Sequence, residues 1–328
     1  MGHDMRWTFI AWAPHSRRSE VFAKALGGSL HCIHYLRFQS PPYAPAKYVL
    51  QSIRTWQVLM AERPQAVHVQ NPPCVCGLAV YLYCRLAGAT FVLDHHSAAF
   101  APIWAWASPV QAFLARRAAT NIVTNQHWAD LVRSWGAQAL IMGDPFLELP
   151  QGRPFSVGPA FNVAVISTFA PDEPLHDVVM AATRLPDVHF YITGDSRRSP
   201  TGFLSNLPDN VTCTGFLPDP QYVGLLTAVD AIMVLTTRDY TLQLGGCEAV
   251  SAGQPLLTSN WPFLQSFFPQ GTIYVANTAD GIQVGVLEMQ KRQRQLKEEM
   301  ANFRETARQD WTAQSARLRQ LVAGSVPC

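Results

Sequence analysis

The stretch AIMVLTTRDYTLQLGGCEAVSAGQPLLTS, Ala231–Ser259, places an apolar run at each end of a glycine pair and a small-residue segment. Short apolar runs bounded by turn residues predict buried strands, and the segment between them is long enough for a crossover helix. A strand, a helix and a second strand in this order form the repeating unit of a parallel α/β sheet. One carboxylate, Glu248, lies just after the glycine pair, which raises the question of whether this turn meets a ligand.

The same alternation extends over both halves of the chain. In the first half, strands are predicted at Trp7–Trp12, Ser29–Leu36, Ala66–Gln70, Thr90–Asp94, Asn121–Thr124 and Ala139–Met142, with helices including Ser19–Leu26, Ala46–Glu62 and Val110–Ala118. In the second half, strands are predicted at Asn162–Ser167, Asp187–Asp195, Asn210–Gly215, Ala231–Thr237, Pro255–Ser259 and Thr272–Asn277. Between them, Leu147–Ala160 is rich in Pro and Gly, which is typical of a domain boundary.

These patterns predict an α/β protein with two tandem doubly wound, Rossmann-like domains, at residues 1–150 and 151–328. A helix over about residues 279–322 closes the structure, and we leave open that it packs back on the first domain. Parallel sheets bind ligands at the carboxyl ends of their strands, so we expect the two domains to face a cleft that holds the site.

Composition excludes several classes of protein. The 328 residues are 48% hydrophobic and carry a formal net charge of +2, which argues against disorder and against a dedicated nucleic-acid binder. The odd count of cysteines, 7, is typical of a reduced, cytoplasmic protein, and Cys74 and Cys76 lack a second pair at zinc spacing. The start of the chain lacks a signal-peptide pattern, and Arg85 interrupts the apolar stretch Cys74–Asp94, which favours a buried helix and strand over a membrane span.

Polar residues follow three predicted strands of the first domain. Ser16, Arg17 and Arg18 come first, with Ser19 as the expected helix N-cap; they could contact an anion or an acceptor, or simply form a capped helix. Asn71 precedes two prolines in a rigid loop that either presents its amide to a ligand or is a structural turn. Asp94, His95 and His96 suit proton transfer or contact with a sugar hydroxyl, with a structural histidine as the alternative.

The second domain offers a matching set. Thr168 ends one strand, and Gly215, Phe216 and Leu217 form a turn that could grip a flat base. Gly245, Gly246 and Cys247 open the helix of the first-quoted stretch, where backbone N–H groups suit a diphosphate. Glu248 could accept two ribose hydroxyls, although an acid near a helix start is also favourable by itself, by about 0.3–1 kcal/mol.

Taken in order, these segments resemble the two-Rossmann (GT-B) glycosyltransferases, close to the family 4 pattern. The run Glu248–Leu257 resembles the second half of the family's E-G-F-G-x-x-x-x-E loop, helix and G-x-P-V. The run Thr214–Thr237 resembles the family's base-binding turn, helix and strand. The loops HSRRSE, VQNPP, LDHHS and ISTFAPDEPL are similar to those of the eukaryotic chitobiosyldiphosphodolichol β-mannosyltransferases. Two positions depart from the pattern. The family's first glutamate falls on Tyr240, with Asp239 the nearest carboxylate, and its E-K-G is Asp172–Pro174.

The resemblance implies a metal-independent hexosyltransferase that needs no cofactor and moves a sugar from a UDP- or GDP-sugar to a hydroxyl acceptor. The implied acceptor is a lipid-linked or polysaccharide precursor. It further implies that Glu248 binds the ribose, and that Arg238, Arg197 or Arg18 replaces the missing lysine at the diphosphate. His96, with Asp94 or Asp239, would carry catalysis, while Ser16, Arg17, Asn71 and His95 would lie on the acceptor side. Whether the sugar configuration is retained or inverted stays open.

Aromatic and basic residues in residues 41–56 and 100–117 are typical of an interfacial element, so we expect peripheral contact with the inner membrane face, or else a core role for these aromatics. Two alternatives to the transferase remain. A nucleotide-sugar epimerase has the same paired domains, and a non-catalytic sugar-nucleotide sensor would bind the donor without turning it over.

Overall fold

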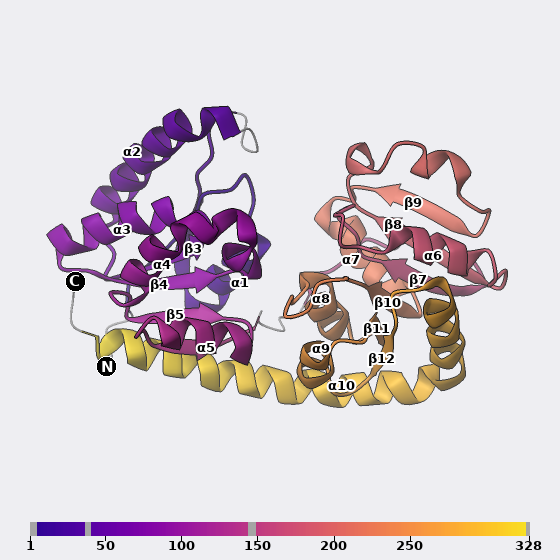
Figure 1. Ribbon diagram of the computed structural model, residues 1–328. Coiled ribbons are helices and arrows are strands. Elements are labelled where there is room, and N and C mark those ends of the chain that lie inside the picture. Colours follow the sequence, from indigo (N-terminus) through magenta and orange to yellow (C-terminus); the bar gives the residue numbers. More distant parts are fainter. Residues whose placement is uncertain (1–4, 37–40, 144–148, 326–328) are drawn as a thin grey trace. The chain divides into compact units, whose positions relative to one another are not determined.

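The computed structural model describes residues 5–36, 41–143 and 149–325. Two compact units account for the chain: one comprises residues 1–145 together with 310–328, and the other comprises residues 146–309. Each unit contains one parallel β-sheet with helices on both faces (Figure 1). The predicted boundary at Leu147–Ala160 falls partly outside the described residues.

The first sheet has the order β2-β1-β3-β4-β5-β6, with every pair parallel. Its strands are β1 (Trp7–Ala11), β2 (Gly28–Cys32), β3 (Ala66–Asn71), β4 (Thr90–His95), β5 (Thr120–Val123) and β6 (Ala139–Ile141). Its helices are α1 (Arg17–Leu26), α2 (Ala44–Glu62), α3 (Cys74–Ala87), α4 (Ser108–Ala115) and α5 (Gln126–Ser134), with short 3₁₀ turns at Pro41–Tyr43, Ser97–Phe100 and Pro102–Ala107. The strand order reverses between β1 and β3, because β2 lies on one side of β1 and all later strands lie on the other. Parallel sheets bind ligands at the carboxyl ends of the strands at such a switch point.

The strands of this sheet are nearly continuous apolar runs, so that successive side chains face opposite sides and both faces of the sheet are buried. On one face, Leu59 of α2, Val80 of α3 and Leu114 of α4 pack together with strand residues in a single core. On the other, Phe22 and Leu26 of α1 share a core with Val92 of β4 and Ile122 of β5. The polar residues at the strand ends are therefore carried by a fully packed scaffold.

The second sheet has the order β12-β11-β10-β7-β8-β9, again with every pair parallel. Its strands are β7 (Phe161–Val165), β8 (Val188–Thr193), β9 (Val211–Gly215), β10 (Ala231–Val234), β11 (Leu256–Ser259) and β12 (Thr272–Val275). Its helices are α6 (Leu175–Ala182), α7 (Asp219–Ala228), α8 (Leu244–Ala252) and α9 (Pro262–Phe267), with 3₁₀ turns at Ser196–Arg198 and Phe203–Asn206. The strand order reverses between β7 and β10, so the loops after these two strands form the switch point.

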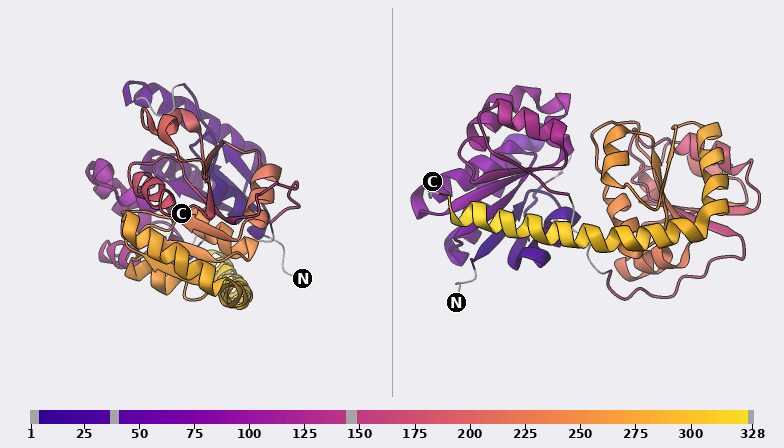
Figure 2. Two further views of the ribbon diagram at one scale, coloured as in Figure 1. Left: turned by 90° about the vertical axis from the view of Figure 1, so that its right-hand side faces the viewer. Right: turned by 90° about the horizontal axis from the view of Figure 1, so that it is seen from below.

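The last helix, α10 (Ala279–Ala323), is one continuous helix, drawn in yellow in Figure 2. Its first part buries Ile282 and Met289 in the core that also contains Val163 of the second sheet. Its last part buries Leu318 and Val322 in the core shared with α1. The contact pattern accordingly assigns the helix up to Gln309 to one unit and the rest to the other.

The structure confirms the predicted fold class, and each of the twelve predicted strands is present, with ends that differ from the predicted ones by a few residues in either direction. The predicted strand Ser29–Leu36 ends at Cys32, and Leu36 has a positive φ of 57°. The expected N-cap Ser19 is wrong: α1 begins at Arg17, and Ser16 is its N-cap. The stretch Cys74–Asp94 is a buried helix and strand as predicted, and no helix among the described residues has the length and apolarity to cross a membrane.

Candidate functional site

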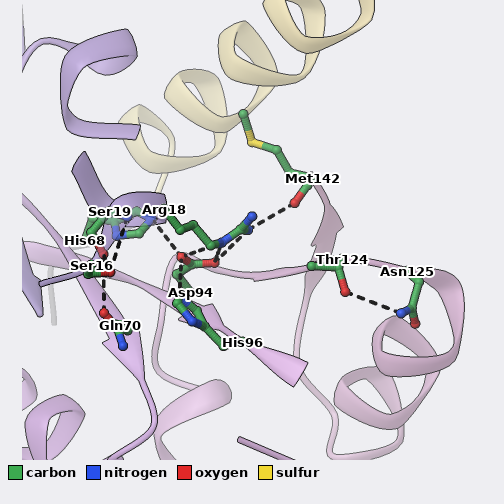
Figure 3. A network of polar contacts seen from close by, with 10 residues as sticks. All are labelled: Ser16, Arg18, Ser19, His68, Gln70, Asp94, His96, Thr124, Asn125 and Met142. Atoms are coloured by element: carbon green, nitrogen blue, oxygen red, sulfur yellow. Dashed lines mark hydrogen bonds and ion pairs between the residues drawn. The ribbon is translucent and has the colours of Figure 1, made fainter. Parts of the chain in front are cut away.

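The carboxyl ends of β1 and β4 meet in a buried ion pair in the first unit (Figure 3). Arg18 lies in the first turn of α1, and its Nε donates to Asp94 Oδ2 at 2.9 Å and Oδ1 at 3.1 Å. A guanidinium nitrogen also donates to Asp94 Oδ1 at 2.9 Å and to the carbonyl of Met142 at 3.1 Å. The side chains are 9% and 0% exposed, so this pair is shielded from water.

Burial alone would raise the pKa of Asp94, because a desolvated carboxylate is unfavourable. The Arg18 guanidinium and the neighbouring His96 outweigh that effect and hold the pKa of Asp94 well below its ordinary value. Asp94 is therefore a stable anion within the fold. The predicted contact of Arg18 with a diphosphate does not fit this geometry, because the Arg18 guanidinium points inward and donates to Asp94.

Two further histidines face Asp94. His96 Nε2 lies 3.5 Å from Asp94 Oδ2, and the His96 side chain is 27% exposed, so it joins the buried carboxylate to the surface. His68 Nε2 lies 3.9 Å from the same oxygen but is fully buried against the rings of Phe9 and Phe22. Burial lowers the pKa of His68 to about 4, which leaves its ring neutral. Sequence reasoning missed His68 because it lies inside an apolar strand.

His95 and Asn71 are internal, in contrast to the predicted acceptor side. The His95 ring is 1% exposed; Nδ1 lies 2.9 Å from Asn71 Nδ2, and Nε2 lies 2.9 Å from Asn121 Oδ1. Asn71 Nδ2 also donates to Gln111 Oε1 at 3.0 Å, and burial lowers the pKa of His95 to about 4. This hydrogen-bonded chain ties β3, β4, β5 and α4 together, so the structural alternative holds for both residues.

Ser16 and Arg17 also have local partners. Ser16 is buried, donates its hydroxyl to Ser19 Oγ at 2.9 Å and accepts from the Ser19 backbone N–H at 3.4 Å. Arg17 forms an ion pair with Glu20 at 3.2 Å on the exposed side of α1. The helix is therefore capped, as the simpler interpretation of this turn predicts, but by Ser16 in place of the expected Ser19.

In the second unit, Glu248 and the turn after β9 retain surfaces that a ligand could reach. Glu248 lies in the second turn of α8, and Tyr222 of α7 donates its hydroxyl to Glu248 Oε2 at 2.5 Å. Phe216 follows Gly215, whose φ of 69° turns the chain, and its side chain is 78% exposed. An aromatic ring with that exposure offers a flat apolar face. Leu217, the next residue, packs against the core instead.

The glycine pair at the start of α8 is explained by packing. A Cβ on Gly245 would lie 2.9 Å from Ile166 Cγ2, and one on Gly246 would lie 2.7 Å from Phe268 Cζ. α8 begins one residue earlier than the pair, at Leu244, and the Gly246 N–H donates to the carbonyl of Gln243 at 3.1 Å. Glycine at these positions brings the helix close to the core, and Cys247 is buried behind it.

Sequence reasoning also missed the role of Glu173 at the loop after β7. Its carboxylate accepts from Ser167 Oγ at 2.7 Å, from Thr168 N at 3.0 Å and Thr168 Oγ1 at 2.9 Å, and from Ala170 N at 3.2 Å. Thr168, which the sequence predicts as a nucleotide contact, thus donates both its N–H and its hydroxyl to the Glu173 carboxylate. The position of Glu173 just before α6 was visible in sequence, but its direction back into the loop was not.

The charged residues after β8 and β10 pair locally. Arg238 is 59% exposed and lies 3.4 Å from Asp172 Oδ1, while Asp172 Oδ2 accepts from Thr236 Oγ1 at 2.8 Å. Arg197 is 89% exposed and binds Asp195 through two nitrogens. Asp239 accepts from the backbone N–H of Tyr240 at 2.6 Å and is partly exposed. Arg238 is thus the predicted cation nearest the switch point beside β7.

The described residues contain no group of three or more His, Cys, Asp or Glu side chains placed to hold a metal ion. A cavity of about 770 Å³ lies at the opposite, amino edge of the first sheet, lined by Arg6, Gln65 and Thr90 at three strand starts and by Val322 of α10. None of the predicted site residues lines it. The chemistry-bearing side chains lie instead at the carboxyl edges.

Comparison with known proteins shows similarity in sequence to one family and in structure to several solved proteins. Residues 176–323 match the family model described as glycosyl transferase-like, and no curated protein has a detectably similar sequence. The structure is similar to sucrose-phosphate synthase from Thermosynechococcus elongatus, with a TM-score of 0.70 and 16% identity over 98% of this chain and 100% of that one. It is similar to HepE from Anabaena in complex with UDP and glucose, with a TM-score of 0.70 and 13% identity over 98% and 100% of the chains.

A third similar structure is the calicheamicin glycosyltransferase CalG4, with a TM-score of 0.54 and 14% identity over 98% of this chain and 99% of that one. Identities at this level establish the fold, and the family match covers α6 to the end of α10. The described residues supply the two parallel six-stranded sheets and the C-terminal helix of that fold. The chain therefore has the two-Rossmann (GT-B) fold of these structures, and its residues 176–323 match a family described as glycosyl transferase-like.

Proposed function

We propose that the protein transfers a hexose from a nucleotide diphosphate sugar to a hydroxyl acceptor. The observation that carries the proposal is the carboxyl edge of the second sheet, where Glu248, exposed Phe216 and Arg238 follow parallel strands within the region of the family match. Ligands of doubly wound sheets bind at this edge. HepE, one of the similar structures, has UDP and UDP-glucose complexes, which favours a UDP-sugar over a GDP-sugar.

Each part of the donor has a matching group. Phe216 offers a face on which the base can stack, and Glu248, oriented by Tyr222, is an acceptor for ribose hydroxyls. The first N–H groups of a helix and a nearby guanidinium stabilise a departing diphosphate, and α8 and Arg238 supply these two features. In the proposed reaction, side chains and backbone N–H groups stabilise the leaving diphosphate without a metal ion.

In the first unit, His96 is the proposed group that contacts a sugar hydroxyl. Its ring is partly exposed, whereas His95 and His68 are buried, and Asp94 Oδ2 lies 3.5 Å from its Nε2. A histidine oriented by a carboxylate can accept or donate a proton near neutral pH. The proposed acceptor is a lipid-linked or polysaccharide precursor, which fits the exposed apolar residues described next.

A peripheral membrane contact is the second component of the proposal. In the predicted interfacial segments, α2 exposes Val49 and Ile53 at 59% and 52%, and the 3₁₀ turn Pro102–Ala107 exposes Ile103 and Trp106 at 76% and 67%. Arg54 is exposed beside Ile53. Apolar side chains interspersed with arginine are the composition of surfaces that bind anionic lipid.

Incubation with a panel of UDP- and GDP-sugars, with and without membrane lipid extract, tests the transfer. Nucleotide release that requires the extract supports the transferase, and release of an altered sugar without an acceptor indicates the epimerase. Binding without turnover indicates the sensor. Phe216→Ala should weaken donor binding by roughly tenfold without changing the melting temperature, because a stacked aromatic contributes about 1–3 kcal/mol per base and this ring is exposed. Unchanged donor affinity in this variant would remove the base assignment.

Co-sedimentation with vesicles of anionic lipid tests the membrane component. An Ile53→Ser and Trp106→Ser double variant should lose vesicle binding, whereas Leu204→Ser, at a residue 40% exposed in the second unit, should not. Absence of binding by the unaltered protein would rule this component out while leaving the transfer assay unaffected.

A further inference from the structure

The closest partner of Asp94 is Arg18, and His96 comes second. Oδ1 accepts only from the guanidinium among the contacts above, at 2.9 and 3.1 Å. Oδ2 accepts from Arg18 Nε at 2.9 Å and faces His96 Nε2 at the longer distance of 3.5 Å. The carboxylate that faces His96 therefore shares its charge with a cation that is almost fully buried.

We propose that Arg18 is a positioning residue for His96: it fixes the Asp94 carboxylate and balances its charge, so that Asp94 orients the imidazole without forcing a proton onto it. The role of that imidazole in sugar transfer rests on the proposed function. Arg18 itself is buried and bonded to Asp94 and Met142, so it acts through Asp94 and not on a substrate.

Asp94 needs a counter-charge, which Arg18 supplies in the wild-type protein. A buried carboxylate is costly unless paired, and removal of one partner of a buried pair leaves an uncompensated charge. Without Arg18, the groups left to compensate Asp94 are imidazoles: His96, His68 on β3 and the neighbouring His95 on β4. His96 is the most exposed of the three, so it would take up the proton. On this proposal, the Arg18 guanidinium keeps Asp94 from drawing a proton onto His96.

Nuclear magnetic resonance titration of the His96 ring tests this without any substrate. The ring signals are assigned by comparison with His96→Gln, and the midpoint is measured in wild type, Arg18→Lys and Arg18→Met. We expect Arg18→Met to raise the midpoint by about one pH unit or more, since an opposite charge within about 4–6 Å favours the charged form. Arg18→Lys should keep it within about 0.5 unit, because the ammonium retains the charge. An unchanged midpoint in folded Arg18→Met would overturn the proposal.

Arg18→Met alone leaves a buried carboxylate unpaired and can prevent folding, so a charge-neutral double variant completes the design. In Arg18→Met with Asp94→Asn, both members of the pair are neutral. The His96 midpoint should then match wild type within about 0.5 unit, because the balanced pair exerts little net pull. A midpoint that falls by a full unit or more would show that Asp94 charges His96 despite Arg18, and would contradict the inference.

Activity measurements separate this proposal from the proposed function. In a working transfer assay, Arg18→Met should lower kcat and shift the acidic limb of its pH profile upward with the titration midpoint, while donor KM stays within about twofold. A merely structural loss would lower activity at every pH by the same factor. If no sugar is transferred by the unaltered protein, the proposed function fails, and the titration still decides the role of Arg18.

Discussion

Asp94 and Arg18 are 76 positions apart in the sequence and depend on each other in the fold. Both side chains are within a tenth of full burial, and each supplies the charge that the other lacks. Sequence reasoning placed both at the carboxyl edge of the sheet but assigned Arg18 to a ligand, because a pattern shows which residues follow strands and not which way they turn. Glu173 illustrates the same limit, since its carboxylate bends back onto Thr168.

Asp94→Asn is expected to lower the free energy of unfolding by roughly 3–5 kcal/mol, because it leaves the Arg18 guanidinium buried without a counter-charge. Denaturant unfolding followed by circular dichroism measures the change. Asp195→Asn is the matched control, since its pair with Arg197 lies at the surface and should leave stability unchanged within error. Equal effects of the two substitutions would contradict the buried-pair interpretation.

Acid should destabilise the protein before the carboxylates titrate. The folded-state pKa values of His68 and His95 are about 4, below the unfolded value of about 6.5. Between these values the unfolded chain binds the extra protons, so stability falls as pH drops from 6.5 to 4, by up to roughly 3 kcal/mol for each ring. Asp94 causes a separate loss of stability below about pH 4, because its pKa is lower in the folded than in the unfolded state and the unfolded chain binds the proton first.

Unfolding free energy measured from pH 7 to pH 4 checks this expectation. His68→Phe removes one of the two buried imidazoles and should make the loss of stability with falling pH about half as steep. Stability at pH 7 should stay near wild type, because neither nitrogen of His68 has a hydrogen-bond partner among the described residues. Equal slopes for wild type and His68→Phe would show that the buried rings do not set the pH dependence.

At the scale of elements, the alternation of apolar runs was enough to locate the strands and the class of fold. It was enough because strands of a parallel sheet are buried on both faces and appear as short apolar runs. Cap and contact details were less predictable. Ser16 caps α1, and not Ser19. Serine is a favoured N-cap residue at either position, so the sequence alone did not decide between the two. His68 gave no signal, because a histidine flanked by two valines in the buried strand Ala66–Asn71 does not stand out from the apolar pattern.

The glycine pair shows how one motif can be required by packing as well as by a predicted ligand contact. The sequence predicts that the backbone approaches a diphosphate here, and the missing Cβ atoms face Ile166 and Phe268. The pair does set how close α8 lies to the core, and so where the helix start meets any ligand. Its sequence position was predictable, whereas its packing partners lie in other elements.

Gly246→Ala is expected to destabilise the protein by roughly 1–3 kcal/mol, although alanine is a better helix former by about 1 kcal/mol, because its Cβ would lie 2.7 Å from Phe268 Cζ. Thermal unfolding measures the change. Adding Phe268→Leu to Gly246→Ala should recover part of the stability relative to the sum of the single variants, since the leucine vacates that space. Additive losses would show that the clash is not the cause.

At the scale of the whole molecule, α10 contributes to the cores of both units. Ile282, Met289 and Met300 are buried against the second sheet, while Leu318 and Val322 are buried beside α1 and β1. Residues 310–325 are therefore needed by a sheet that begins more than two hundred positions earlier in the chain. The sequence indicates a long helix, but its mixed polar pattern does not show which side of the helix is buried at each turn.

Leu318→Ala and Met289→Ala test this division with two substitutions on one helix. Both residues are at most 1% exposed, so each change should cost roughly 2–5 kcal/mol in the unit where the side chain is buried. Hydrogen exchange read by mass spectrometry should become faster in β1 and α1 for Leu318→Ala, and in β7 and β8 for Met289→Ala. Faster exchange in the same strands for both variants would mean that the helix stabilises one cooperative body, and the assignment of its two ends to separate cores would be wrong.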